Sequence, residues 1–525
     1  MQEAETASPG ENEATQPMNV ALWKDALLQS PTPDNLSRLF KALFSSEQGL
    51  EAVRLALEVV SSHPDDMALT ITAADLISKH TARHDIVATL LRSVLLRSPD
   101  VVSVQAFLAD SLVASGDIAG GLTLFSEMMA RYPRERASLC EHISLSLLEA
   151  GYAYEASQIL FLWLKDGETT AALLNNMGCA LERLGRSTEA IPWYEKALTV
   201  APEDPTIRFG YAMTLLKAGN LREGFARYVE RAPLTDGQTG WFMSLPRLRH
   251  GDDVAGKKVI LYQEQGLGDT IQFIRSVPYL QAQGAEVTIA VPWGLVRLLA
   301  QSFPDVSVRS IVEFGQEDGY SYAAPIPDLP FIAGVMSESD IPAPIPYLRA
   351  DADDVARFAA MLPARRPRIG LVWAGDRRVK SEHVAADKRR STTLAEMGAA
   401  LCPVDATLVN LQFGLPRAEI EAWQGQSLFD PMGDVRDMAD TAALMESLDL
   451  LISVDTSPVH LAGAIGLPVW LVNRWDACWR WGDEGDNSPW YPRTRVFRAR
   501  EKSFAPVLRE VGEALHTWVE AWKAG

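Results

Sequence analysis

LLISVDTSPVHLAGAIGLPVWL, residues 450–471, carries the clearest evidence of architecture in this chain. It opens with Leu450–Val454, a run with the length and composition of a buried parallel strand. Ser457 is a favoured helix N-cap, and Pro458 suits the first helical position, where no N–H is needed. Gly466 then ends the helix, and a second strand follows. We therefore predict a strand, a tight turn, a helix and a strand, with a helix N-terminus at which a phosphate can bind.

A second stretch, VILYQEQGLGDTIQFIR at Val259–Arg275, shows the same order of elements. A strand leads into a loop with two glycines, Gly266 and Gly268, and then into a helix. Glycine allows a sharp turn and lets a ligand approach the backbone closely. Asp269 falls at the helix N-terminus, beside the crevice in which parallel sheets bind ligands. Together the two stretches favour a binding site over an ordinary βαβ unit, in which their polar side chains would only cap and pack.

Composition narrows the class of protein. The 525 residues correspond to about three domains, and 47% hydrophobic residues suffice for their cores. No apolar run reaches the roughly 18 residues of a membrane span, and residues 1–17 are expected to form a disordered acidic tail, not a signal peptide. The net charge of −19 disfavours nucleic acid and anionic membranes as partners. The four scattered cysteines argue against a disulfide framework or a zinc site and suit a cytoplasmic protein.

Residues 18–235 carry an internal repeat with a period of about 34 residues. The clearest copy, Ala172–Pro205, has Gly, Ala, Tyr and Pro at the positions typical of tetratricopeptide repeats. One period before and after Gly185 stand Gly151 and Gly219. The period predicts an α solenoid of five to six stacked helical hairpins, whose concave surface binds an extended peptide or a protein.

From Lys257 onward the pattern changes to alternating β and α segments, after an irregular break at 234–251. It predicts two doubly wound halves, 236–355 and 356–500, followed by a last helix within 501–525. The expected strands are Lys258–Tyr262, Glu286–Val291, Val306–Ser310, Ile369–Trp373, Thr407–Leu411, Leu450–Val454 and Val469–Val472. The expected helices are Thr270–Gln283, Leu295–Ser302 and Phe504–Lys523, and the Pro-rich segments Ala324–Pro330 and Ile341–Pro346 are expected to be loops.

GLGD at Gly266–Asp269 and DTSPVHLAGAIG at Asp455–Gly466 resemble the two motifs of glycosyltransferase family nine, the bacterial heptosyltransferase-like enzymes. The resemblance runs from about Val259 to the C-terminus. LYQEQGLGDTIQF, IPAPIPYL, IGLVWAGD, DTAALMESLDLLISVDT and NSPWYP further resemble segments of bacterial proteins that join such a domain to tetratricopeptide repeats, flagellin glycosyltransferases among them. The resemblance implies two Rossmann-like halves facing a cleft (the GT-B fold), metal-independent transfer with inversion, and a last helix that crosses back onto the first half.

Glycosyl transfer needs a base for the acceptor hydroxyl and cationic or N–H groups for the departing phosphate. Asp269 matches the family's loop aspartate and is the expected base; the alternative is a carboxylate that only caps its helix. The loop Gly375–Ser391 carries six basic residues, of which Lys388 and Arg390 best match the family's basic pair. The family motif has Asn where this chain has Arg389, so the register is open by one residue.

The remaining donor-site candidates follow the strands of the second half. The amides of Thr456, Ser457 and Val459 are expected to hold phosphate, and Asp455 to take sugar hydroxyls. His460 is expected to reach the phosphate or sugar, with helix packing as the alternative. Gln412 stands where heptosyltransferases tend to carry a nucleotide-contacting Glu. The full predicted donor site is Gly266, Gly268, Lys388, Arg390, Gln412, Asp455, Thr456, Ser457 and His460.

Two further sets of residues are weaker candidates. Asp440 and Thr441 begin the helix before strand Leu450–Val454. A tryptophan tract could stack a base or a sugar, or could equally pack in the core; it comprises Trp475, Trp479, Trp481 and Trp490. No metal-ligand cluster and no D-x-D pair appears in the sequence, and no cofactor beyond the nucleotide-sugar substrate is expected.

The sequence thus predicts a cytoplasmic protein O-glycosyltransferase. The repeats would bind a protein acceptor, and the C-terminal part would transfer a sugar from a nucleotide to Ser or Thr. The resemblance implies flagellin as acceptor and CMP-pseudaminic acid or a related nonulosonic acid as donor. Two alternatives remain open: a transferase acting on lipopolysaccharide or another glycan, and a repeat adaptor without activity.

Overall fold

The computed structural model describes residues 20–46, 48–81, 83–167, 169–231, 240–314, 319–342, 344–375, 387 and 389–524. The chain divides into two compact units, Met1–Ala150 and Gly151–Gly525. The division falls inside the predicted repeat region 18–235. The second unit therefore contains part of the repeat region as well as the whole α/β part.

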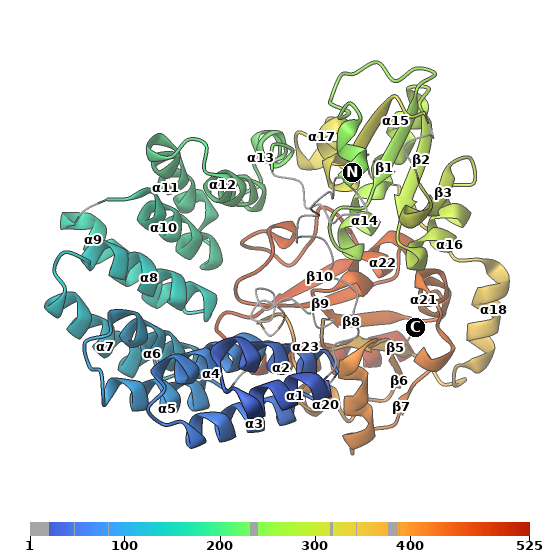
Figure 1. Cartoon of the computed structure of the whole chain (residues 1–525). Helices are drawn as coiled ribbons and strands as arrows, with labels where there is room; N and C mark the ends of the chain where they lie inside the picture. The colour runs from blue at the N-terminus through green and yellow to red at the C-terminus, as the bar shows by residue number, and fades with distance from the viewer. Residues whose placement is uncertain are drawn as a thin grey trace, which may run out of the picture. The chain divides into compact units, whose positions relative to one another are not determined.

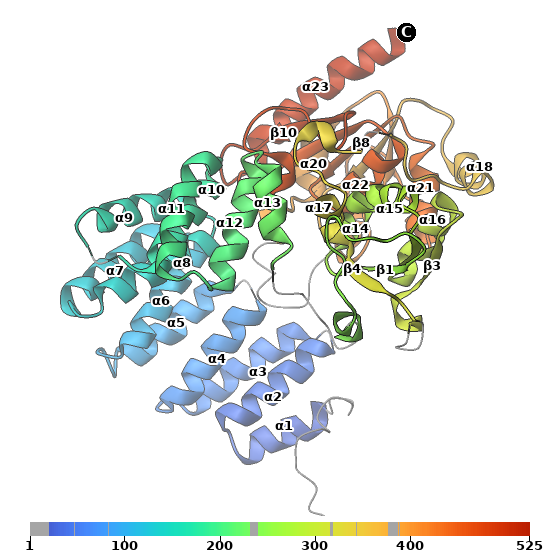
Figure 2. The ribbon, with the colours of Figure 1, turned by 90° about the horizontal axis from the view of Figure 1, so that it is seen from above.

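The first unit and the beginning of the second consist of antiparallel helices, as the 34-residue period predicts (Figures 1 and 2). Turns between the helices of a hairpin use glycine in the left-handed region, with φ of 94° at Gly116, 70° at Gly185 and 81° at Gly219. Only glycine adopts this conformation at little cost, which explains why it recurs at the repeat period. The helices of the first unit are α1 Val20–Gln29, α2 Pro33–Ser45, α3 Gly49–Ser62, α4 Met67–His80, α5 His84–Leu95, α6 Val102–Ser115, α7 Ile118–Arg131 and α8 Arg136–Glu149. The repeat helices of the second unit are α9 Ala153–Asp166, α10 Ala171–Arg183, α11 Ser187–Val200, α12 Pro205–Lys217 and α13 Leu221–Tyr228.

Two parallel sheets follow, as expected for two Rossmann-like halves. The first has the order β3-β2-β1-β4 and the second the order β10-β9-β8-β5-β6-β7, with parallel pairs throughout. The strands are β1 Lys258–Tyr262, β2 Glu286–Val291, β3 Ser307–Ser310, β4 Tyr322–Pro325, β5 Arg368–Val372, β6 Thr407–Asn410, β7 Leu428–Phe429, β8 Leu450–Val454, β9 Val469–Asn473 and β10 Thr494–Arg498. The helices between and after them are α14 Leu267–Phe273, α15 Val277–Ala282, α16 Trp293–Ser302, α17 Leu329–Ile332, α18 Ala352–Met361, α20 Leu394–Leu401, α21 Met438–Met445, α22 Ser457–Ile465 and α23 Ala505–Ala524. The predicted fold class, a tetratricopeptide solenoid followed by an α/β part with two such halves, is confirmed.

The structure corrects several predicted elements. Part of the expected loop 324–330 belongs to strand β4, which lies at a sheet edge where the missing N–H of Pro325 is tolerated. Strand β10 is also an edge strand and was missed because Arg495 and Arg498 interrupt its apolar pattern. The single helix expected at 270–283 is divided into α14, a 3₁₀ turn at Ile274–Ser276, and α15.

The last helix does not cross back onto the first half, so that prediction is wrong. In α23, apolar residues three or four positions apart face the second sheet and share a core with strands β5 and β8 and with helix α20. Gly512 brings α23 close to α20, because a Cβ at that position would lie 2.1 Å from the Ala400 carbonyl oxygen. Burial of this apolar face on the second sheet determines where the helix packs. The buried α23 residues are Val507, Leu508, Val511, Leu515 and Val519.

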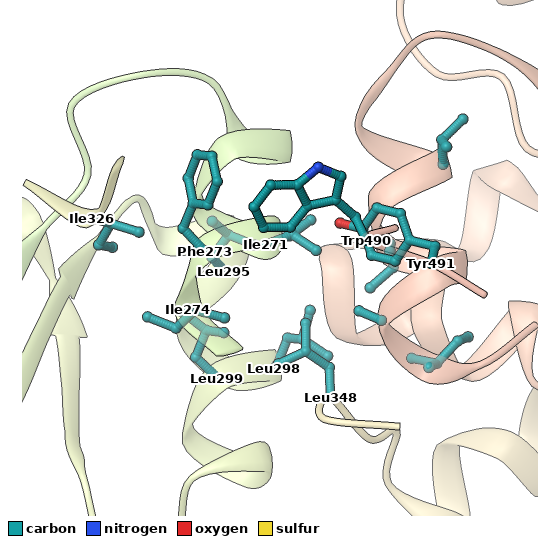
Figure 3. Packing of buried hydrophobic residues seen from close by; sticks show 14 of the residues in the cluster. Ile271, Phe273, Ile274, Leu295, Leu298, Leu299, Ile326, Leu348, Trp490 and Tyr491 are labelled. Atoms are coloured by element: carbon teal, nitrogen blue, oxygen red, sulfur yellow. The ribbon is translucent and has the colours of Figure 1, made fainter. Parts of the chain in front are cut away.

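The last repeat hairpin shares one hydrophobic core with the α/β part. Phe225 of α13 makes an edge contact with Trp490, at a centroid distance of 6.4 Å. Trp490 in turn lies 6.0 Å from Phe273 of α14 (Figure 3). Just beyond α13, Arg231 donates hydrogen bonds to Glu264, which follows β1, and to Asp328. The repeat helices thus end before the compositional break near residue 234, but the hydrophobic core of the last hairpin continues into that of the α/β part.

Candidate functional site

The two sequence motifs lie against each other. A Cβ placed on Gly268 would come within 2.7 Å of Cδ2 and 3.3 Å of Nε2 of His460. Gly268 lies in the first turn of α14 and His460 in the first turn of α22, so the two helix N-termini converge. Gly266 has an ordinary φ of −65°, and neither glycine has a positive φ. The absent side chain of Gly268 thus makes room for the imidazole of His460, and this close approach joins the two halves.

His460 is buried among aromatic and cationic side chains. Its Nδ1 lies 3.0 Å from the Tyr491 hydroxyl, and its ring stacks on Trp481 at a centroid distance of 5.7 Å. Burial lowers the pKa of His460 well below its usual value, and the positive charges of Arg480 and Arg275 lower it further. The imidazole is therefore neutral at pH 7 and can accept or donate one hydrogen bond at each nitrogen.

Asp269 occupies the third position of α14, and its carboxylate forms an ion pair with Arg480. Arg480 also donates a 2.6 Å hydrogen bond to Oε1 of Gln272, one turn further along the same helix. Burial disfavours the charge of Arg480, but the neighbouring Asp269 carboxylate outweighs it, so the Arg480 pKa lies above its usual value. The arginine comes from the second half, and it fixes the orientation of the predicted base in the first half.

The N-terminus of α22 differs in detail from the sequence prediction. The N-cap is Thr456, not Ser457, and Pro458 is the second helical residue. The Thr456 side chain does not cap the helix, since its hydroxyl donates to the Val454 carbonyl oxygen at 3.2 Å. The Val459 amide donates to the Thr456 carbonyl oxygen, so this donor is already used within the turn. The amides of Thr456 and Ser457 remain the predicted phosphate donors.

Asp455 and the residues after β9 and β5 share one edge of the second sheet. Strands β9, β8 and β5 are neighbours and parallel, so their carboxyl ends lie side by side. Asp455 follows β8 and Arg474 follows β9. Burial disfavours the charge of Arg474, but the carboxylates of Asp476 and Asp455 outweigh this effect and raise the Arg474 pKa. Beyond β5, a Cβ on Gly375 would lie 2.6 Å from Cζ of Arg390. Arg390 is therefore close to the strand ends, where it was predicted to act.

Of the basic loop Gly375–Ser391, the structure describes residues 375, 387 and 389–391. Lys388, the other half of the predicted basic pair, lies outside the described residues, as do the first three basic residues of the loop. Arg390 forms an ion pair with Asp387 at 2.8 Å, and Arg389 donates to Asp476 at 2.8 Å. Arg474 approaches the same Asp476 carboxylate at 3.3 Å. Which of the loop's basic residues contacts phosphate stays a prediction.

Gln412 has a well-defined place behind the strand ends. Its Oε1 accepts hydrogen bonds from the amides of Trp373 and Ala374, at 3.1 and 2.9 Å. Its Nε2 donates to the carbonyl oxygens of Ala374 and Phe413, both at 3.0 Å. The side chain is buried and joins the ends of β5 and β6. A contact between Gln412 and the nucleotide stays a prediction, and it would require the exchange of one of these bonds.

The weaker candidates, Asp440, Thr441 and the tryptophan tract, lie mostly in packed positions, and the two polar side chains interact with other residues of the chain. Asp440 is buried in an ion-pair network with Arg297, Arg357 and Arg436, and the Thr441 hydroxyl donates to a backbone carbonyl. Arg297 belongs to α16 of the first half, so this network also joins the halves. Burial alone would raise the Asp440 pKa, but the Arg436 and Arg297 guanidinium groups hold it well below its usual value. In the tryptophan tract, core packing is confirmed for Trp479, Trp481 and Trp490, whereas Trp475 is partly exposed.

Sequence reasoning missed three residues that shape the site: Arg474, Arg480 and Tyr491. All lie in the segment after β9, which was interpreted only as an aromatic tract. A basic residue flanked by tryptophans, as in CWRW at 478–481, is unusual in a core and could have indicated a buried ion pair.

Within the described part of the chain, no group of three or more His, Cys, Asp or Glu side chains is arranged to hold a metal ion. No helix there has the length and apolarity needed to cross a membrane. The four cysteines are unpaired.

Comparison with known proteins gives one match to the repeats and one to nearly the whole chain. A family model described as "Tetratricopeptide repeat" matches residues 107–227, which confirms the repeats there. Protein FlbA of Caulobacter vibrioides (strain ATCC 19089 / CIP 103742 / CB 15) is 25% identical over 574 aligned positions, which cover 94% of each chain. The chain therefore has a distant relative along nearly its whole length.

Solved structures are similar to one part or the other. The ADP-heptose lipopolysaccharide heptosyltransferase II of E. coli is 16% identical with a TM-score of 0.35, covering 50% of this chain and 99% of that one. The iron-containing dodecameric glycosyltransferase TibC from enterotoxigenic E. coli H10407 is 13% identical with a TM-score of 0.34, covering 52% and 76%. The tetratricopeptide repeat protein TTC0263 of Thermus thermophilus is 22% identical with a TM-score of 0.26, covering 35% and 100%.

Proposed function

We propose that this chain is a protein O-glycosyltransferase that moves a sugar from a nucleotide to Ser or Thr of an acceptor bound by the repeats. The acceptor proposed is flagellin and the donor is CMP-pseudaminic acid or a related nonulosonic acid. Both identities rest on the resemblance of the sequence segments to those of flagellin glycosyltransferases. The proposed location is the cytoplasm, which the scattered, unpaired cysteines favour.

The observation that carries the proposal is the contact between the two motifs, with the His460 imidazole in the space left by Gly268. It brings together the Asp269 carboxylate and the N-terminus of α22, where the side chain of the N-cap residue Thr456 does not cap the helix. Transfer to a hydroxyl needs these two elements, a base and a phosphate-binding end, within reach of one substrate.

In the proposed reaction Asp269 removes the proton of the acceptor hydroxyl, and Arg480 holds its carboxylate in place. The hydroxyl oxygen attacks the anomeric carbon, and the bond from that carbon to the phosphate oxygen breaks. The Thr456 and Ser457 amides and Arg390 stabilise the charge that develops on the departing phosphate. Inversion follows from a single displacement at the anomeric carbon.

The test uses the purified full chain with CMP-pseudaminic acid and flagellin, followed by intact mass. We expect a mass increase of one sugar per modified site. Asp269→Asn should lower the transfer rate by about 10²–10⁴-fold, typical of the loss of a general base. The matched control is Asp305→Asn, at an exposed aspartate of the same half, which should transfer at the wild-type rate.

Three other outcomes would contradict the proposed base, the proposed acceptor or the proposed activity. Wild-type transfer by Asp269→Asn would leave Asp269 as a helix-terminal carboxylate only. Transfer to a glycan and not to flagellin would favour the lipopolysaccharide-type alternative. Absence of any turnover with a panel of nucleotide sugars would favour the adaptor.

A further inference from the structure

A cavity of about 1410 Å³ lies inside the Gly151–Gly525 unit, between repeat helices and the second sheet. One wall consists of the turns at Gly151–Glu155 and Arg183–Gly185. The opposite wall consists of segments after β9 and β10, and of residues on the outer face of α23. The cavity is therefore bounded by both functional parts of the chain.

The two walls are fixed to each other. Asp483, in the segment after β9, accepts hydrogen bonds from the Ser187 amide at 2.8 Å and from its hydroxyl at 3.0 Å, at the start of α11. Lys217 of α12 is buried beside the same carboxylate, at 3.8 Å, and forms an ion pair with Glu182 at 2.7 Å. These contacts make the cavity a constant feature of the unit.

The lining does not suit a nucleotide sugar. Seven basic and seven acidic side chains line the cavity, so its charge is balanced. A phosphate-bearing donor favours an excess of cations. The volume also exceeds the roughly 300–1,000 Å³ of small-molecule sites. Side chains of both signs together with the rings of Tyr152, Tyr154 and Trp475 suit a polar polypeptide segment.

The cavity reaches the predicted donor site. Arg474 lines it and follows β9, whose Val472 pairs with Val454 of β8, so Arg474 lies beside the strand end that carries Asp455. On the outer side, Tyr154 is 61% exposed on the repeat wall, and Glu513 is exposed on α23. A segment in the cavity would thus extend from the repeats to the strand ends.

We propose that this cavity receives an extended segment of the acceptor protein and presents its Ser or Thr to the donor. The proposal rests on the function proposed above and adds the path by which the acceptor reaches the site. It also assigns a role to the outer face of α23, as one wall of that path.

The first test fills the cavity from α23. Glu513→Trp should lower kcat/KM for flagellin by about ten-fold or more, equivalent to about 1.4 kcal/mol, while hydrolysis of CMP-pseudaminic acid without acceptor stays unchanged. The control Glu520→Trp lies on the same helix, is exposed and does not line the cavity, and should match the wild type. If Glu513→Trp modifies flagellin as fast as Glu520→Trp, the acceptor does not use the cavity and this proposal fails alone. If the wild type neither hydrolyses the donor nor modifies flagellin, both proposals fail.

The second test locates the acceptor directly. A photoreactive phenylalanine at Tyr154 should cross-link flagellin, whereas the same group at Leu162, exposed on the same helix but outside the cavity, should not. Cross-links at both positions in equal yield, or only at Leu162, would overturn the proposal. Mass spectrometry of the cross-linked peptide should find a segment that contains a glycosylated Ser or Thr.

Discussion

Replacing Gly268 by Ala tests the contact on which the site depends. The added Cβ would lie 2.7 Å from Cδ2 of His460, which is about 0.8–1.3 Å short of the optimal separation of two carbon atoms. The imidazole cannot move away without loss of its bond to the Tyr491 hydroxyl or its stacking on Trp481. Either α14 or the His460 ring must therefore shift.

The expected cost follows from three contributions. Overpacking of a dense core costs about 1–3 kcal/mol, and loss of the His460 hydrogen bond costs about 0.5–1.5 kcal/mol. Ala gains up to about 1 kcal/mol over Gly in a helix. The net expectation is a destabilisation of about 0.5–3.5 kcal/mol. The control Gly294→Ala, in the first turn of α16 with no atom within 4 Å of its Cβ, should be neutral or slightly stabilising.

Urea unfolding followed by tryptophan fluorescence is the assay, because thirteen of the fourteen tryptophans lie in the Gly151–Gly525 unit. A double-mutant cycle with His460→Ala identifies the contact, because removal of the imidazole should relieve the clash and give a coupling of about 1 kcal/mol or more. The reasoning is refuted if Gly268→Ala unfolds at the same urea concentration as Gly294→Ala, or if the two changes are additive.

Three further predictions concern the same unit. Arg480→Gln should lower kcat by about 10²-fold with little change in donor KM, because Asp269 loses the group that orients it; an equal rise in KM instead would assign Arg480 to donor binding. Because the folded-state pKa of His460 lies below 6.5, the unfolded chain binds a proton that the folded chain does not, so stability falls as pH drops below about 6.5. Between neutral pH and pH 5.5 the wild type should lose about 1.4 kcal/mol more than His460→Gln, and parallel pH profiles would contradict this. Residues 151–525 expressed alone should fold, whereas residues 236–525 should aggregate or bind a hydrophobic dye; equal solubility of the two pieces would mean that the last repeat is dispensable.

Much of the fold could be predicted because local patterns determine it. The continuous apolar runs at Lys258–Tyr262, Glu286–Val291 and Leu450–Val454 became strands with the predicted bounds, since buried parallel strands need little else. The edge strands β4 and β10 were missed because they carry residues that are unfavourable in a sheet centre, Pro325 in β4 and Arg495 in β10, whereas the edge strand β3 was predicted. Their pairing depends on a neighbour elsewhere in the chain, which a local pattern does not reveal.

The candidate site, too, could be predicted from the sequence only in part. Motifs located Asp269, Asp455 and His460, because glycine-framed helix starts are visible in a single stretch. They did not reveal Arg480, whose partner Asp269 lies 211 residues away in the chain. They also did not distinguish Thr456 from Ser457 as the N-cap of α22. Asp, Thr and Ser are all favoured at an N-cap, and Asp455, Thr456 and Ser457 are consecutive in the chain.

The predicted boundary near residue 234 shows how composition and folding differ. Gly and Pro accumulate there, and a solenoid repeat could end at such a break. Yet the Phe225 ring packs in the same core as Phe273, and the buried Arg231 is paired with Glu264 directly before the GLGD loop. A buried carboxylate that loses its partner costs about 3–5 kcal/mol, so the last hairpin is required by the α/β part and not merely tethered to it. Under the proposed function, in which Asp269 is the base, a last hairpin that holds Glu264 five residues before Asp269 would also couple acceptor binding to the geometry of the site.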